Sequence, residues 1–146
     1  MDSLDVTLRA ALSCLNVPYV WGGNHPLEGF DCSGFCLWVL KSAGVGPKND
    51  CTAQDIYNYF EVQGISRRAH GPGALAFYGE SLTKISHIAF CLNAYQVIEA
   101  GGGSPHCNTK EKAKEIGAMV RVVHLQSRKD LLAILTPDYS RIGRAF

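Results

Sequence analysis

The chain has 146 residues, of which 47% are hydrophobic and 18% are charged. This length suits a single domain, residues 1–146, that buries its core without disulfide bonds. Lysine and arginine number 14 against 13 acidic side chains, so the net charge is +1 and no strong field attracts nucleic acid or an acidic membrane. We therefore expect any polymeric substrate to be held by local contacts.

The N-terminal residues and the cysteines indicate the compartment. Residues 1–5 lack the basic and apolar regions of a signal peptide, and no apolar run approaches a membrane span. We expect synthesis in the cytoplasm and free thiols rather than disulfides. The six cysteines are Cys14, Cys32, Cys36, Cys51, Cys91 and Cys107. Zinc fits poorly because Cys32 and Cys36 have helical spacing, and only His106 and Cys107 leave that alternative open. No metal or cofactor is predicted.

Helical periodicity marks the first third of the chain. Leucines and alanines recur every three or four residues over 4–15, which predicts an amphipathic helix with Asp2 or Ser3 as its N-cap. A glycine-rich loop follows, and Asp31 caps a second predicted helix over 32–43. That helix is apolar on all sides, so it should be central and buried.

The remaining elements change from helix to strand. Thr52 and Asp55 resemble a capping box that starts a third helix, with Gly64 as its stop. Short apolar runs then predict four strands, at 74–78, 88–92, 97–100 and 119–123. A short helix is predicted over 110–116, a helical turn or edge segment over 130–135, and a loosely held tail over 140–146. Helices followed by an antiparallel meander predict an α+β fold.

Cys32 is the candidate nucleophile. It lies between a glycine-rich loop and the first turn of the second helix, where unpaired N–H groups lower the pKa of a thiol from about 8.5 toward neutrality. Cys14, Cys36 and Cys91 lie in apolar periodic segments and are predicted to be small core residues.

His87 is the candidate base, because it starts an apolar strand while the other four histidines lie in loops or at a strand end. A hairpin turning near 93–95 would place position 99 opposite position 87. Glu99 could then accept the imidazole N–H and fix the tautomer of His87. The alternative for Glu99 is a charged residue at the end of a strand. The run Gly101–Gly103 lacks the context of a nucleotide site and is predicted to be a flexible turn.

Three segments together resemble the NlpC family of bacterial cell-wall peptidases: residues 18–23 (PYVWGG), 30–35 (FDCSGF) and 86–90 (SHIAF). The resemblance covers the chain from the first helix to Ala100. It implies a papain-like α+β fold, in which the helix that carries the nucleophile packs on an antiparallel sheet of about four to six strands.

The resemblance also implies roles for individual residues. Cys32 matches the nucleophile, His87 the base and Glu99 the third polar position, which is often His in relatives. Tyr19 matches a tyrosine that lines the cleft, and Trp21 lies in the same segment. Asp31 and Ser33 match positions that in some members hold the free amine of a short stem peptide. Ala74 stands where relatives often have Asp.

The function that follows is that of a cysteine peptidase that cleaves amide bonds in peptidoglycan stem peptides, most often the γ-D-glutamyl–diamino acid bond. Without a signal peptide, such an enzyme would reach the wall after lysis, injection or virion delivery. We favour a phage lysin or tail-associated hydrolase over an injected amidase effector and an intracellular muropeptide-recycling peptidase. The expected partner is a phage tail or a secretion system. A thiol acyltransferase and a non-catalytic binding module are the alternatives of another class.

Overall fold

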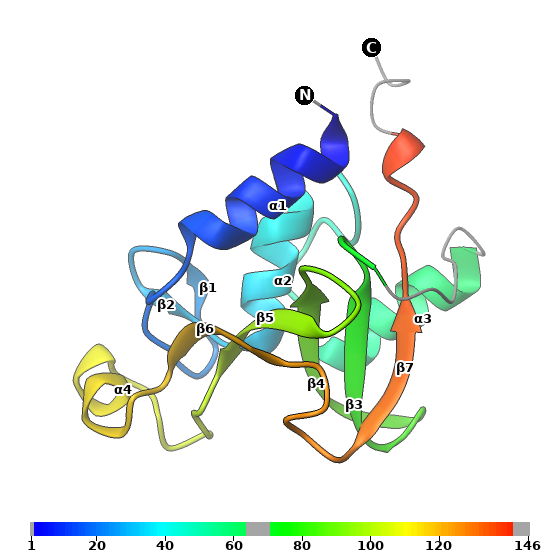
Figure 1. Cartoon of the computed structure of the whole chain (residues 1–146). Helices are drawn as coiled ribbons and strands as arrows, with labels where there is room; N and C mark the ends of the chain where they lie inside the picture. Colours follow the sequence, from blue (N-terminus) through cyan, green and yellow to red (C-terminus); the bar gives the residue numbers. More distant parts are fainter. Residues whose placement is uncertain (1, 64–70, 142–146) are drawn as a thin grey trace.

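The structure is a computed structural model that describes residues 2–63 and 71–141. In these ranges it has a five-stranded antiparallel sheet with three helices, α1 to α3, packed beside it (Figure 1). The elements in chain order are α1 (Ser3–Ser13), β1 (Asn24–His25), β2 (Gly29–Phe30), α2 (Cys32–Lys41), α3 (Ala53–Gln63), β3 (Leu75–Ser81), β4 (Lys84–Cys91), β5 (Gln96–Gly101), α4 (Lys110–Ile116), β6 (Met119–His124), β7 (Leu131–Leu135) and the 3-10 helix η1 (Tyr139–Arg141).

Helix α2 lies at the centre of the molecule, as its apolar sequence predicts. It contacts α1, α3, β4 and β5, and Phe35, Cys36, Val39 and Leu40 are completely buried. Asp31 is its N-cap and accepts a hydrogen bond from the Gly34 N–H at 2.8 Å. The helix ends at Lys41, two residues before its predicted end.

The other two early helices begin where capping residues predict. Asp2 caps α1 by accepting from the Asp5 N–H. Before α3, the Asp55 N–H donates to the Thr52 hydroxyl oxygen, and the Asp55 carboxylate accepts from the Thr52 N–H. These reciprocal bonds confirm the capping box, with Asp in the place of Glu. The predicted stop of α3, Gly64, lies outside the described residues.

The sheet has the strand order β6-β5-β4-β3-β7. One face packs on α1, α2 and α3 through large side chains such as Phe77, Ile88 and Phe90. The opposite face carries small side chains, including Ala76, Ala89 and Cys91, in a second apolar cluster. Both faces are therefore buried, and this explains why strand β4 reads as a continuous apolar run from Ile88 onward.

Two strand features of the structure go beyond the prediction: an edge strand near the C-terminus and a small hairpin before α2. The segment predicted as a helical turn or edge segment is the edge strand β7, which pairs with β3. The loop before α2 contains the small hairpin β1–β2, which was not predicted because two-residue strands carry no periodicity. In addition, no helix in the described ranges is long and apolar enough to cross a membrane.

The first two residues of the predicted loose tail, Ser140 and Arg141, belong to the 3-10 helix η1. The preceding Tyr139 is held, because its hydroxyl donates to the Gly73 carbonyl at 2.6 Å. Residues 142–146 lie outside the described part of the chain.

Candidate active site

Cys32 is the first residue of α2, so the positive end of the helix dipole lies at its thiol. The preceding residue, Asp31, connects this helix end to the loop before it. One Asp31 carboxylate oxygen accepts from the Gly34 N–H, and the other accepts from the Gly22 N–H at 3.1 Å. A side chain at position 34 would collide with the Gly23 carbonyl, so glycine there lets the loop contact the first turn of α2.

His87 and Glu99 contact each other from neighbouring strands. The His87 Nε2 lies 2.9 Å from the Glu99 Oε1, and both side chains are almost completely buried. Because an ionised carboxylate only accepts, Nε2 carries the proton of this hydrogen bond. The remaining ring nitrogen, Nδ1, takes no part in this contact, and Cys32 is a second neighbour that raises the pKa of His87.

The register that brings His87 and Glu99 together differs from the predicted one. Strands β4 and β5 pair Phe90 with Ile98 and Cys91 with Val97, so the same register continued would place position 101, not 99, opposite His87. The predicted register was wrong by two residues. The contact is diagonal, and it survives because a shift of two residues keeps side chains on the same face of the sheet.

Arg121 on β6 completes this group and was not predicted. It is the cross-strand partner of Glu99, and its Nε and Nη2 both donate to the Glu99 Oε2, at 3.3 and 3.2 Å. Its side chain is 41% exposed, against 5% for Glu99. Glu99 is therefore held between a buried imidazole and a partly solvated guanidinium.

These contacts set the pKa values of the group. Burial alone would lower the pKa of His87, but the hydrogen bonds to Cys32 and Glu99 outweigh it and raise this pKa from 6.5 to about 9. Burial would raise the pKa of Glu99, and the contacts with His87 and Arg121 outweigh it and lower this pKa. Both shifts favour a protonated imidazole beside an ionised carboxylate.

Cys32, His87 and Glu99 open onto a cleft of about 860 Å³. The four predicted substrate contacts, Tyr19, Trp21, Asp31 and Ser33, also line this cleft. Its wall further includes Arg121 and Arg128, both of which were missed by the sequence analysis. No spacing relates either arginine to the motif segments, because β6 pairs with β5 only after a long connection that contains α4.

Tyr19 is fixed by contacts from two directions. Its N–H donates to the Ala118 carbonyl at 3.0 Å, and its carbonyl accepts from the Cys107 thiol at 3.4 Å. Burial, followed by the negative charge of Cys32 and Asp31, raises the pKa of the Tyr19 phenol. The hydroxyl stays protonated, and no hydrogen bond occupies it within residues 2–63 and 71–141.

The run Gly101–Gly103 forms part of the cleft rather than only a turn. A Cβ atom on Gly101 would collide with the Glu99 carboxylate, and one on Gly103 would collide with the Tyr19 ring. Gly102 has a φ of +82°, which favours glycine. The absence of side chains here thus leaves room for Glu99 and Tyr19.

The start of α3 also contributes to the site. Thr52 and Ala53 line the cleft, and Gln54 donates to the Leu82 carbonyl and accepts from the Ile85 N–H, both at 2.9 Å. These bonds attach α3 to the strand that carries His87.

None of the other cysteines and histidines in the described part of the chain lines the cleft. Cys14, Cys36 and Cys91 are buried, as predicted, and burial raises the pKa of each thiol, that of Cys91 to about 12. His25 and His124 each accept from a backbone N–H two residues ahead. His70 lies outside the described residues. In the described ranges no three His, Cys, Asp or Glu side chains are placed to hold a metal ion.

The model of the NlpC/P60 family matches residues 16–122 of the chain, which include all the residues that line the cleft except Val123, Ser127 and Arg128. The chain belongs to the NlpC/P60 family. The four helices and five-stranded antiparallel sheet, together with the solved NlpC/P60 domains that resemble it, confirm the predicted papain-like α+β fold.

Curated relatives of the chain are named as endopeptidases, and one of them, RipA of Mycolicibacterium smegmatis, as a peptidoglycan endopeptidase. The chain is 35% identical over 79 residues to the bifunctional muramidase/DL-endopeptidase CwlT of Bacillus subtilis, a match that covers 54% of this chain and 23% of CwlT. Across the curated relatives that it matches, the chain spans between 10% and 39% of their length.

Solved structures of NlpC/P60 proteins share the fold. A lipoprotein-like NLP/P60 protein of Staphylococcus aureus superposes with a TM-score of 0.67 at 25% identity, covering 92% of this chain and 41% of that one. RipD of Mycobacterium tuberculosis, described as a non-catalytic NlpC/p60 domain adapted to peptidoglycan binding, superposes with a TM-score of 0.64 at 20% identity, covering 93% and 97% of the two chains.

Proposed function

We propose that residues 1–146 form one catalytic domain that hydrolyses amide bonds in peptidoglycan stem peptides. Cys32 is the nucleophile, His87 the general base and acid, and Glu99 the residue that orients His87. The observation that carries this proposal is the buried His87–Glu99 contact beside a thiol at a helix N-terminus, at the wall of a cleft wide enough for a peptide.

In the proposed reaction the Cys32 thiolate attacks the carbonyl carbon of the scissile amide. The imidazolium of His87 gives its Nδ1 proton to the leaving amine, and a thioester remains on Cys32. Water then attacks the thioester with His87 as the base, which releases the carboxylate product and regenerates the thiol. The raised pKa of His87 supports this role, because the imidazolium persists through neutral pH.

Two donors are available for the oxyanion of the tetrahedral intermediate. The first is the Cys32 backbone N–H, which lies in the first turn of α2. The second is the Tyr19 hydroxyl, whose raised pKa keeps it protonated and which lines the same cleft. Removing one such donor costs about 100- to 1,000-fold in kcat in enzymes of known mechanism.

The bond that we propose as the target is the γ-D-glutamyl–diamino acid bond. The name of CwlT as a DL-endopeptidase supports this choice, as does the motif resemblance. Asp31 is the proposed partner of a substrate amine, with Ser33 beside it, since the Ser33 hydroxyl donates to the Asp31 Oδ1 at 3.3 Å. Delivery to the wall by a phage remains a prediction from the sequence.

The decisive experiment is digestion of purified sacculi followed by mass spectrometry of the released fragments. The protein should release peptides that end at γ-D-glutamate, and the Cys32→Ala variant should release none. If neither sacculi nor soluble muropeptides yield fragments, the hydrolase proposal is wrong. Retention of the protein on sacculi without release would instead favour a binding module, the role ascribed to RipD.

A further inference from the structure

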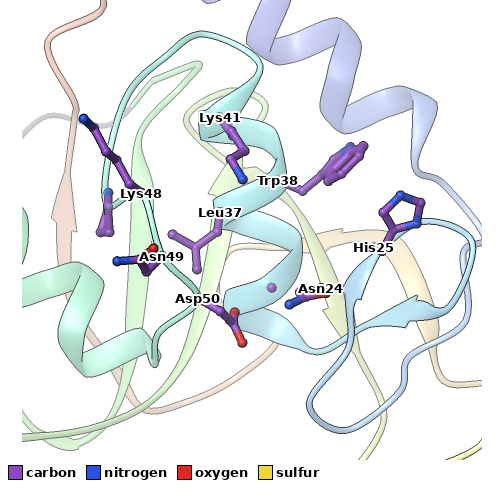
Figure 2. A pocket seen from close by; sticks show the side chains of 10 residues that line it. Asn24, His25, Leu37, Trp38, Lys41, Lys48, Asn49 and Asp50 are labelled. Carbon is purple, nitrogen blue, oxygen red and sulfur yellow. The ribbon is translucent and has the colours of Figure 1, made fainter.

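A second cavity lies on the other side of the first turns of α2. It has a volume of about 240 Å³, small for a ligand pocket but suited to a group about the size of one sugar ring. Its lining residues come from β1, from α2 and from the loop before α3: Asn24, His25, Gly34, Leu37, Trp38, Lys41, Pro47, Lys48, Asn49 and Asp50. We call this cavity the α2 pocket (Figure 2).

The α2 pocket combines an aromatic wall with polar groups at its mouth. Trp38 and His25 are half-buried and meet edge to face, with ring centroids 5.1 Å apart, and Phe30 packs behind Trp38 at 6.1 Å. Figure 2 shows these two rings on one side of the pocket and Asp50 on the other. The Trp38 ring is therefore fixed by its neighbours while it still lines the cavity.

The polar side chains of the α2 pocket have unused hydrogen-bonding capacity. Asn24, Lys41, Lys48, Asn49 and Asp50 are exposed, and within residues 2–63 and 71–141 none makes a side-chain hydrogen bond or ion pair. An amide both donates to and accepts from hydroxyl groups, a carboxylate accepts from them, and ammonium groups donate to ring and carbonyl oxygens. Polar groups of this kind beside a fixed aromatic ring suit a saccharide, whose rim is hydroxylated and whose ring faces carry C–H groups.

The α2 pocket and the cleft are lined by neighbouring residues of the same two segments of the chain. At the start of α2, Asp31 and Ser33 line the cleft and Gly34 lines the pocket. Before and at the start of α3, Asn49 and Asp50 line the pocket, and Thr52 and Ala53 line the cleft. Burial is the main cause that raises the pKa of the Asp31 carboxyl, and the negative charge of Asp50 raises it further. Because the pocket and the cleft are built on the same two segments, one branched polymer is the ligand to test for both.

We propose that the α2 pocket binds a hexosamine unit of the glycan strand to which the stem peptide is attached. This inference rests on the proposed function, because that substrate joins a peptide to an amino sugar through one amide bond. The glycan contact would favour stem peptides that are still attached to the wall over free peptides. The catalytic residues lie outside the pocket, so its contribution is to substrate affinity.

The two tryptophans of the chain allow the two sites to be observed separately, because Trp21 lines the cleft and Trp38 lines the α2 pocket. The Cys32→Ala variant of the 146-residue chain is titrated with an N-acetylglucosamine tetrasaccharide, with sugar-free stem tripeptide and with inorganic phosphate, and the indole N–H signals are followed by NMR. The saccharide should shift the Trp38 signal with saturation and leave Trp21 in place. No saturable Trp38 shift with saccharide, or a shift with phosphate alone, overturns the proposal.

Kinetics give the second test. In the Lys41→Ala/Asn49→Ala variant, the ratio of kcat/KM for glycan-linked to sugar-free substrate should fall about tenfold, mainly through KM, because two hydrogen bonds are lost. Lys114→Ala on α4, an exposed lysine that lines neither cavity, is the matched control. An unchanged ratio refutes the pocket. If neither substrate is cleaved, the proposed hydrolase is wrong, and the Trp38 titration still decides the pocket.

Discussion

Replacing Glu99 with Gln tests the contact on which the proposed catalysis depends most. Glutamine keeps an oxygen that can accept from the His87 Nε2–H, but it removes the negative charge. The pKa of His87 rises from 6.5 to about 9, which at 1.36 kcal/mol per unit is roughly 3 kcal/mol of stabilisation of the imidazolium. Cys32 and Glu99 share this stabilisation, and if Glu99 supplies about half, the variant loses roughly 1.5 kcal/mol.

The expected result is that kcat falls about tenfold. The alkaline limb of the kcat/KM profile, expected near pH 9 in the native protein, should also move to lower pH, because the imidazolium of the variant deprotonates earlier. The assay is hydrolysis of a γ-D-glutamyl tripeptide between pH 5 and pH 10. Arg121 loses its charged partner but is 41% exposed, so water can solvate it.

Glu80→Gln is the matched control, because Glu80 lies on β3 with its side chain 77% exposed, and its one ion pair among the described residues is with Lys84 at 3.8 Å. It should leave both kcat and the profile as in the native protein. If Glu99→Gln does the same, Glu99 does not orient His87. A change in KM alone would mean that Glu99 contacts the substrate instead.

Three further predictions concern the thiols, the cleft wall and stability. Iodoacetamide at neutral pH should label Cys32 first, because four of the other thiols are buried and the pKa of the half-buried Cys51 is raised by its surroundings; equal labelling of Cys32 and Cys51 by mass spectrometry would contradict an activated thiol. Gly103→Ala should reduce kcat/KM at least tenfold, because its Cβ displaces the Tyr19 ring, and an unaltered value would mean that Tyr19 is dispensable. The free energy of unfolding, measured in urea, should contain a contribution from His87 and Glu99 between about pH 4.5 and pH 6.5. The raised pKa of His87 makes its part disappear as pH rises toward 9, and the lowered pKa of Glu99 makes its part disappear below about pH 4.5. Glu99→Gln should flatten this dependence, and a variant that keeps the native curve would refute the linkage.

The sequence predicts local structure well where a capping residue or a long apolar run determines it. Asp31 caps α2. The apolar residues on all sides of α2 explain why this helix lies at the centre of the molecule. The α4 helix begins and ends at the predicted residues because Thr109 caps its start and Gly117 its end.

Long-range pairing is what the sequence does not determine. The His87–Glu99 contact was predicted from a register that was wrong by two residues, and it is present because such a shift preserves the face of the sheet. Arg121 could not be predicted in the same way. It becomes the partner of Glu99 only when β6 returns to the edge of β5 after α4, and no local signal specifies that register.

Asp31 has a consequence for how the cleft meets its substrate. One carboxylate holds the Gly22 amide of the loop and the Gly34 amide of the helix, so the segment that carries Tyr19 and Trp21 cannot move independently of Cys32. The conformational entropy of this wall is lost when the chain folds rather than when the peptide binds. The nucleophile and the proposed oxyanion donors are thus preorganised, and the free energy of binding remains available for selecting the substrate.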